Sequence, residues 1–159
     1  MRPFVRLTVF SLGILLVAPK AGQAQATLGP AIGWHDDYDV GIGAALNVPL
    51  TEFGAGVAIM SDFLYFFPEG GVDYLEFNGN LTYAFSDGAR VAPYILGGVN
   101  VANVSGGLMA ESETRLGVNL GGGIYLNLGR LRPTVGVKAE VGGGKGLVLF
   151  GHLPFVIGN

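Results

Sequence analysis

Hydrophobic and polar residues alternate along most of this chain. Between residues 115 and 128 every even position is aliphatic or glycine, and the odd positions are polar, aromatic or glycine. A period of two places successive side chains on opposite faces of a β-strand, whereas a helix would scatter the same leucines around its circumference. We therefore predict one long strand in this segment.

The same alternation predicts seven further strands. It is clear at residues 39–50, 73–85, 131–141 and 146–157, and less regular at residues 28–35, 53–67 and 90–101. Turn-forming residues favour tight connections at residues 49–52, 86–88 and 129–130, and longer ones at residues 35–38, 68–72, 105–113 and 142–145. Short and longer connections then alternate, which is typical of a barrel with one end in the periplasm and the other outside the cell.

The first 26 residues are predicted to be a cleaved signal peptide. Arg2 and Arg6 precede an apolar run of about ten residues, roughly half the length that a membrane-spanning helix needs. Ala24-Gln25-Ala26 then supplies the pattern of small residues that signal peptidase recognises. The folded domain is expected to comprise residues 27–159.

Composition favours a membrane barrel over a secreted globule. Charged residues make up 13% of the chain, against about 25% in typical soluble domains, and there is no cysteine for a disulfide framework. No apolar stretch reaches the roughly 18 residues of a spanning helix, and a closed barrel is the other structure that satisfies every backbone group in lipid. We predict an all-β fold, an eight-stranded antiparallel up-and-down transmembrane β-barrel. A soluble lipocalin- or avidin-like barrel is the alternative, and it predicts a charged outer face.

Aromatic residues gather near the predicted strand ends, as in the two aromatic girdles of outer-membrane barrels. Toward the end with the longer connections these are Trp34, Tyr38, Phe63, Tyr65, Phe66, Phe67 and Tyr74. Toward the other end they are Phe53, Tyr83, Phe85, Tyr94, Tyr125 and Phe155.

The C-terminal third carries a recognisable pattern. Residues 116–123 (LGVNLGGG), 131–138 (LRPTVGVK) and 149–155 (LFGHLPF) resemble the closing strands of small outer-membrane β-barrel domain proteins, the OmpA/OmpX-like eight-stranded group. The resemblance covers about 45 residues and implies architecture only. It also implies that the barrel-assembly machinery reads the last strand at the aromatic Phe155. Pro154, which has no amide hydrogen, interrupts the predicted ladder of that strand.

Four charged residues are predicted to face the lumen: Glu76, Arg115, Lys138 and Glu140. An eight-stranded barrel is only wide enough inside for side chains to fill it, and buried charges must be paired. We therefore expect an ion-pair network among these four that plugs the bore. A narrow gated pore lined by the same residues is the alternative.

The end with the longer connections is acidic. Asp36, Asp37 and Asp39 form a possible cation-binding rim, since hard divalent cations prefer oxygen ligands, and a solvated repulsive rim is the alternative. The other acids assigned to this end are Asp62, Glu69, Asp73, Glu111 and Glu113, with Arg115 and Lys145 as the main basic residues. After residue 26 the formal net charge is about −6, so the domain lacks the basic face that nucleic acid requires.

Candidate chemistry is sparse. The two histidines, His35 and His152, are expected at opposite ends of the barrel, His35 as a polar loop residue and His152 in the lumen near the periplasmic mouth. The chain has no nucleophile-elbow, zinc-protease or P-loop motif. No catalytic residue, metal or cofactor is predicted.

The sequence thus predicts a small, porin-like but non-enzymatic protein of a Gram-negative outer membrane, monomeric, with a structural or surface-interaction role. The expected partners are outer-membrane lipid, lipopolysaccharide and the barrel-assembly machinery. A lipid-modifying barrel enzyme and a soluble periplasmic ligand-binding barrel are the remaining alternatives.

Overall fold

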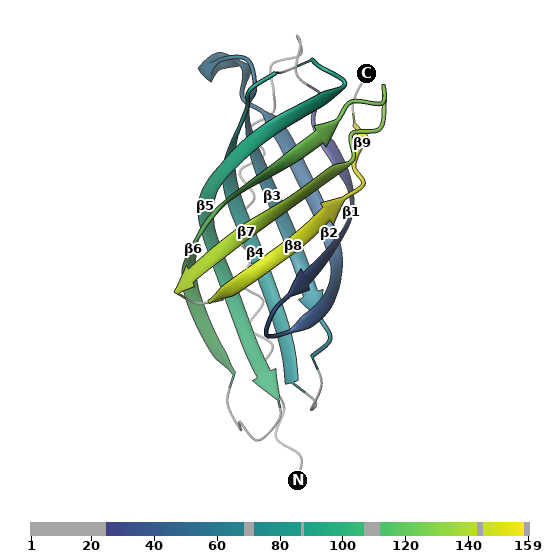
Figure 1. The fold of residues 1–159 in the computed structure, drawn as a ribbon. Coiled ribbons are helices and arrows are strands. Elements are labelled where there is room, and N and C mark those ends of the chain that lie inside the picture. The colour runs from purple at the N-terminus through teal and green to yellow at the C-terminus, as the bar shows by residue number, and fades with distance from the viewer. Residues whose placement is uncertain (1–24, 69–71, 87, 107–111, 143–144, 158–159) are drawn as a thin grey trace.

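The computed structural model of the protein describes residues 25–68, 72–86, 88–106, 112–142 and 145–157 (Figure 1). Of the predicted signal peptide only Gln25 and Ala26 fall within these ranges, and Glu69 and Glu111 of the acidic end lie outside them. No helix among the described residues is long and apolar enough to span a membrane. The elements are β1 (Thr27–His35), β2 (Asp39–Pro49), the 3-10 helix η1 (Thr51–Phe53), β3 (Val57–Phe66), β4 (Val72–Ala84), β5 (Val91–Gly106), β6 (Glu113–Leu126), β7 (Thr134–Gly142), β8 (Gly146–His152) and β9 (Phe155–Val156).

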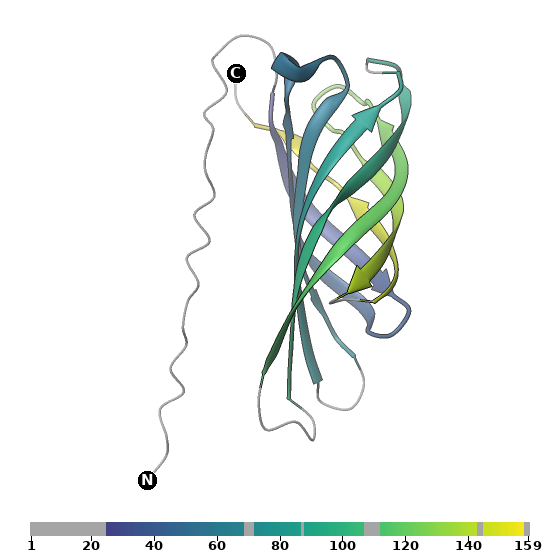
Figure 2. The same cartoon turned by 90° about the vertical axis from the view of Figure 1, so that its left-hand side faces the viewer.

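The strands form one closed antiparallel barrel. Each strand from β1 to β7 pairs with the next along the chain, and β1 pairs with β8 as well as with β2 (Figures 1 and 2). β8 and β9 are two parts of one eighth strand, because Ala31 pairs with His152 and Leu28 with Phe155 in an unbroken register. The predicted eight-stranded up-and-down barrel is therefore confirmed.

Pro154 interrupts the last strand without shifting it. The amide of Leu153 donates to the carbonyl of Pro30 at 2.9 Å, and beyond the proline the amide of Val156 donates to Arg130 on the other side at 2.9 Å. Gly29 faces the break, where a Cβ atom would lie 2.3 Å from the Leu153 carbonyl oxygen. The missing donor of Pro154 is thus tolerated, and a glycine makes the close approach at the seam possible.

The alternation assigns the two faces of the wall as predicted. Leu116, Val118 and Leu120 point outward with 74%, 55% and 73% of their surface exposed. Asn119, between them, is buried in the lumen. The outer surface is therefore a continuous apolar band and the interior is where the polar side chains lie.

Two apolar layers occupy the lumen. We call the end where β1 begins and β9 ends the end with the termini. One layer, toward the opposite end, contains Leu64, Phe66, Tyr74 and Val148, with Tyr38 packed against it. The other, toward the termini, contains Met60, Tyr94, Leu96, Tyr125 and Phe150. Glycine provides room for the rings, since a Cβ on Gly136 would lie 2.5 Å from the Phe150 ring.

The predicted alternation of short and longer connections is wrong. At the end with the termini the connections span residues 50–56, 85–90 and 127–133, and at the other end residues 36–38, 67–71, 107–112 and 143–145. Strand length differs around the barrel instead, because β5 and β6 contain 16 and 14 residues while β7 and β8 contain 9 and 7. One side of the barrel consequently reaches further from the end where β1 begins and β9 ends than the other side does (Figure 2).

The aromatic girdles are only partly as predicted. Of the predicted girdle residues, Trp34, Phe63, Tyr83 and Phe85 lie on the outer surface, but four others are buried in the lumen. These four are Phe66, Tyr74, Tyr94 and Tyr125. They occupy the same alternate positions as the lumen-facing polar residues of their strands. Nearness to a strand end does not show on which face of the strand a ring lies.

Candidate functional site

A charged cluster lies across the middle of the lumen, centred on Lys138 of β7. The ammonium Nζ is 2.7 Å from Glu76 Oε1 of β4 and 2.8 Å from Glu140 Oε1 of its own strand. All three side chains are at most 3% exposed. Because β4 and β7 lie on different sides of the barrel, the Lys138–Glu76 pair bridges the bore.

Asp62 of β3 extends this cluster. Its Oδ1 accepts a hydrogen bond from Asn78 Nδ2 at 2.8 Å, and the same amide also donates to Glu76. Tyr74 Oη donates to the other carboxylate oxygen of Glu76 at 3.2 Å. Lumen-facing positions of β3, β4 and β7 thus contribute three carboxyl groups and one ammonium to a single buried site.

An asparagine network continues the cluster along the neighbouring strands β4, β5 and β6. Asn119 of β6 donates to Asn78 Oδ1 at 2.8 Å and to Asn80 Oδ1 at 2.9 Å, and it accepts from Asn100 Nδ2 at 2.9 Å. A side-chain amide both donates and accepts, so such a chain pairs polar groups of these strands without adding charge. Buried polar networks of this kind hold side chains in fixed positions when they are satisfied.

The electrostatics of the cluster are unbalanced. Among the described residues the buried carboxyl groups near Lys138 are those of Asp62, Glu76 and Glu140, so acidic groups outnumber the single ammonium. Uncompensated buried charge is unfavourable by several kcal/mol per ion, in order of magnitude. The contacts of Lys138 and the amide donors of Asn78 therefore compensate the buried charge, and removing one partner alone would leave it unpaired.

Of the four residues predicted for this network, the structure brings together Glu76, Lys138 and Glu140. Arg115 does not join them. It lies at the outer end of β6, where its guanidinium pairs with Glu113 at 2.7 Å and both side chains are partly exposed. Arg115 lies on the predicted side of its strand but at a different position along the barrel axis. The stagger of the tilted strands places it beyond the cluster.

Sequence reasoning assigned Asp62 to the acidic rim, and this was wrong. Asp62 is 7% exposed and faces the lumen. Its strand carries apolar residues on both faces, with Met60 and Leu64 pointing inward and Ile59 and Phe63 pointing outward. The alternation therefore does not show clearly which side chains of this strand point into the lumen. The signal that could have found it is the register with β4, which sets Asp62 opposite Asn78.

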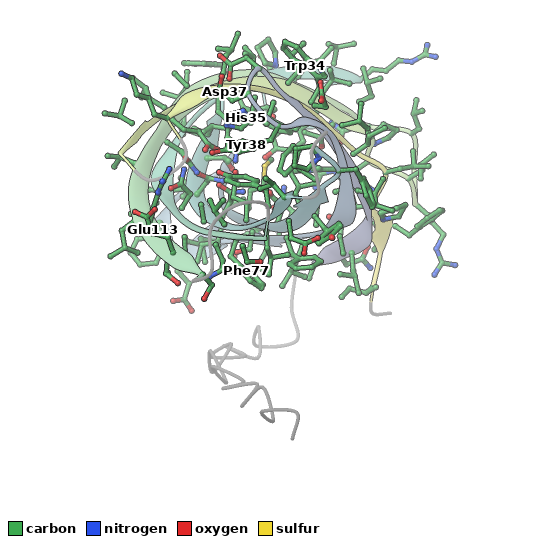
Figure 3. The ribbon with its side chains drawn as sticks, turned by 90° about the horizontal axis from the view of Figure 1, so that it is seen from below. Trp34, His35, Asp37, Tyr38, Phe77 and Glu113 are labelled. Atoms are coloured by element: carbon green, nitrogen blue, oxygen red, sulfur yellow. The ribbon has the colours of Figure 1, made fainter. Side chains whose placement is uncertain are left out.

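Aromatic residues close the lumen at the end away from the termini. The Tyr38 ring stacks on the Tyr74 ring at a centroid distance of 3.8 Å, and His35 packs edge-on against Tyr38 at 4.8 Å. Seen from this end, His35 and Tyr38 lie within the ring of strands (Figure 3). His35 is fully buried and its Nδ1 accepts a hydrogen bond from the Asp37 amide at 3.0 Å, so its prediction as a polar loop residue was wrong.

The acidic turn at the same end, residues 36–39, contacts β8 through Asp36. Within the described ranges no group of three or more His, Cys, Asp or Glu side chains is arranged to hold a metal ion. Asp36 Oδ1 instead accepts a hydrogen bond from the Leu147 amide at 3.0 Å, which ties the turn between β1 and β2 to β8. The structure thus gives no support to a cation-binding rim of Asp36, Asp37 and Asp39.

Comparison with solved structures identifies the architecture. The N-terminal β-barrel domain of Pseudomonas aeruginosa OprF superposes with a TM-score of 0.66 at 15% sequence identity, covering 84% of this chain and 100% of that domain. Neisserial surface protein A (NspA) superposes with a TM-score of 0.56 at 12% identity, covering 84% of this chain and 96% of NspA. The chain has the fold of the small eight-stranded outer-membrane barrels. No protein-family profile and no curated sequence matches it.

This eight-stranded outer-membrane barrel fold accounts for the apolar outer band described above. The sequence resemblance to the OmpA/OmpX-like group, which rested on the closing strands, is confirmed by structural neighbours that span almost the whole barrel. At 12–15% identity the likeness concerns the fold alone.

Proposed function

We propose that this protein is an integral outer-membrane barrel with a filled, non-conducting lumen and a structural or surface-interaction role. The observation that carries the proposal is the layered interior, in which the Lys138–Glu76–Glu140 cluster lies between two apolar layers. An ion crossing the bore would have to displace the ion pairs and then pass aromatic side chains on either side. An eight-stranded barrel leaves little room beyond that of its own side chains.

The absence of assembled catalytic groups supports a non-enzymatic role. Nucleophilic catalysis needs a nucleophile within hydrogen-bond reach of a base that a third group orients. In the described part of the chain, His35 is surrounded by Tyr38, Phe66 and Tyr74, with no serine among its hydrogen-bond partners. A lipid-modifying enzyme would require such a pair.

Assembly and oligomeric state follow from the same proposal. Phe155 lies on the outer face of β9, 52% exposed, where the assembly machinery would reach it. The barrel is closed, so it has no free sheet edge that a second copy would need to cover. The protein is accordingly proposed to be a monomer in contact with lipid and lipopolysaccharide.

Planar-bilayer recording tests the filled lumen. The refolded wild-type barrel is expected to give no steady single-channel current. The variant Glu76→Ala, Lys138→Ala, Glu140→Ala leaves both apolar layers in place and is expected to stay closed as well. Adding Phe66→Ala, Tyr74→Ala, Tyr94→Ala and Tyr125→Ala removes rings on either side of the cluster and is expected to conduct, which demonstrates that the assay detects an opened bore. Steady currents from the wild type would contradict the filled lumen and favour the narrow pore.

Fractionation tests the location independently. Outer-membrane recovery together with heat-modifiable migration on a gel is expected for a folded membrane barrel. Recovery from the soluble periplasmic fraction without detergent would contradict the membrane placement and favour the soluble ligand-binding barrel.

A further inference from the structure

A groove crosses the outer surface of the barrel at its closing seam, where β7, β8 and β1 lie side by side. Its volume is about 330 Å³, and its lining is almost entirely apolar. The floor is Gly151, which pairs with Ile32 on one side and with Val135 on the other. Those two side chains, 55% and 56% exposed, form the walls.

The shape of the groove follows from its residues. Gly151 occupies an outward-facing position with no side chain, between two β-branched neighbours that stand out from the sheet. Pro30, Pro133 and Leu153 border the groove toward the end with the termini. The groove is therefore a depression in the apolar band, open to whatever covers that band.

We infer that this groove binds one acyl chain of a glycerophospholipid from the periplasmic leaflet, with the lipid phosphate held by Arg130. The inference rests on the membrane placement proposed above. The groove is continuous with the surface that faces hydrocarbon, so the medium around it consists of acyl chains. It lies in the half of the barrel where β1 begins and β9 ends. An even number of strands brings the start of the first strand and the end of the last to the same side, and we assign that side to the periplasm, from which an exported chain enters the outer membrane.

Charge at the end of the groove argues for a phosphate-bearing lipid. Arg130 is exposed in the turn between β6 and β7, and its carbonyl accepts a hydrogen bond from Val156 of β9. No ion pair to Arg130 is formed by the residues that the structure describes. Val156 lies five residues beyond Gly151 on the same strand, about 17 Å at roughly 3.3 Å per residue. An extended acyl chain is long enough to join a headgroup at Arg130 to the groove floor.

Native mass spectrometry of the detergent-purified barrel with added phosphatidylglycerol tests the inference. The wild type is expected to retain one lipid. Gly151→Leu fills the groove without a backbone clash, because the nearest atom to a Cβ there, Ile32 Cγ2, is 3.5 Å away. We expect this variant to bind about tenfold more weakly, the loss that follows when roughly two methylene groups are kept out of the groove.

Matched controls separate the groove from general surface effects. Gly79→Leu adds the same side chain at an outward glycine of β4 with nothing within 4 Å of its Cβ, and it is expected to bind as the wild type does. Arg130→Gln is expected to weaken phosphatidylglycerol binding by about threefold and to leave the binding of uncharged diacylglycerol unchanged. Arg90→Gln, in another turn at the same end, is expected to change the binding of neither phosphatidylglycerol nor diacylglycerol.

Equal phosphatidylglycerol binding by Gly151→Leu and Gly79→Leu would overturn the proposal that the groove binds an acyl chain. Equal loss of both lipids in Arg130→Gln would overturn the assignment of the phosphate. Heat-modifiable migration is recorded for every variant, so that a failure to fold is distinguished from a failure to bind. A folded barrel that inserts into vesicles yet retains no lipid would refute this inference while leaving the membrane placement intact.

Discussion

Replacing Lys138 by methionine removes the only ammonium of the lumen cluster while keeping most of its side-chain volume. In the wild type the Nζ contacts Glu76 at 2.7 Å and Glu140 at 2.8 Å, and both carboxylates are buried. Removing one partner of a buried ion pair destabilises a protein by about 3–5 kcal/mol, because the other charge stays buried without compensation. Here two carboxylates lose their partner, so we expect a loss near the upper end of that range.

The assay is equilibrium urea unfolding of the barrel in lipid vesicles, read by heat-modifiable migration. A loss of about 4 kcal/mol corresponds to a change of roughly a thousandfold in the ratio of folded to unfolded protein. The control is the charge-free variant Asp62→Asn, Glu76→Gln, Lys138→Met, Glu140→Gln, which is expected to match or exceed wild-type stability because no buried charge is left unpaired. A Lys138→Met barrel within about 1 kcal/mol of the wild type would refute the electrostatic account of the cluster.

Three further predictions address the wall and its turns. Leu120→Arg places a charge on the lipid face and is expected to destabilise the barrel by about 2–4 kcal/mol in a bilayer; little effect in the same urea titration would mean that Leu120 does not face hydrocarbon. Gly29→Val is expected to destabilise by about 1–3 kcal/mol, because its Cβ would lie 2.3 Å from the Leu153 carbonyl, whereas Gly79→Val has open space and serves as control. Asp39 has φ +60°, so Asp39→Val should be destabilising by about 1–2 kcal/mol and Asp39→Gly should not; equal midpoints for the two variants would rule out backbone strain at this turn.

Much of the fold follows from the sequence because a membrane barrel repeats one simple rule. Each residue of a strand faces either lipid or lumen, and a period of two reveals which. Where the lumen is polar, as along β4 with Glu76, Asn78 and Asn80, alternation identifies both the strand and the facing of its residues. Where the lumen is apolar, as along β3, both faces carry hydrophobic residues and the facing of Asp62 could not be recovered.

The membership of the cluster required information that alternation does not contain. Glu76 and Arg115 both occupy positions that the alternation places on the lumen side. Glu76 contacts Lys138, whereas Arg115 pairs with Glu113 at the rim. Height along the barrel depends on strand tilt and stagger, which arise from the pairing of all the strands together. The side of a strand on which a residue lies is a local property of the sequence. Its position along the barrel axis is a property of the closed barrel.

The closing seam constrains how the protein assembles. Thr27 pairs with Val156, so the first strand acquires its second neighbour only after nearly the whole domain has been made. Until then the backbone donors and acceptors on that side of β1 are unsatisfied, which makes the nascent chain a template for unwanted strand pairing. Contacts this distant in sequence also form slowly. A chain truncated before its last strand would leave two unprotected edges, and we would expect it to be degraded or to aggregate rather than to persist as a smaller barrel.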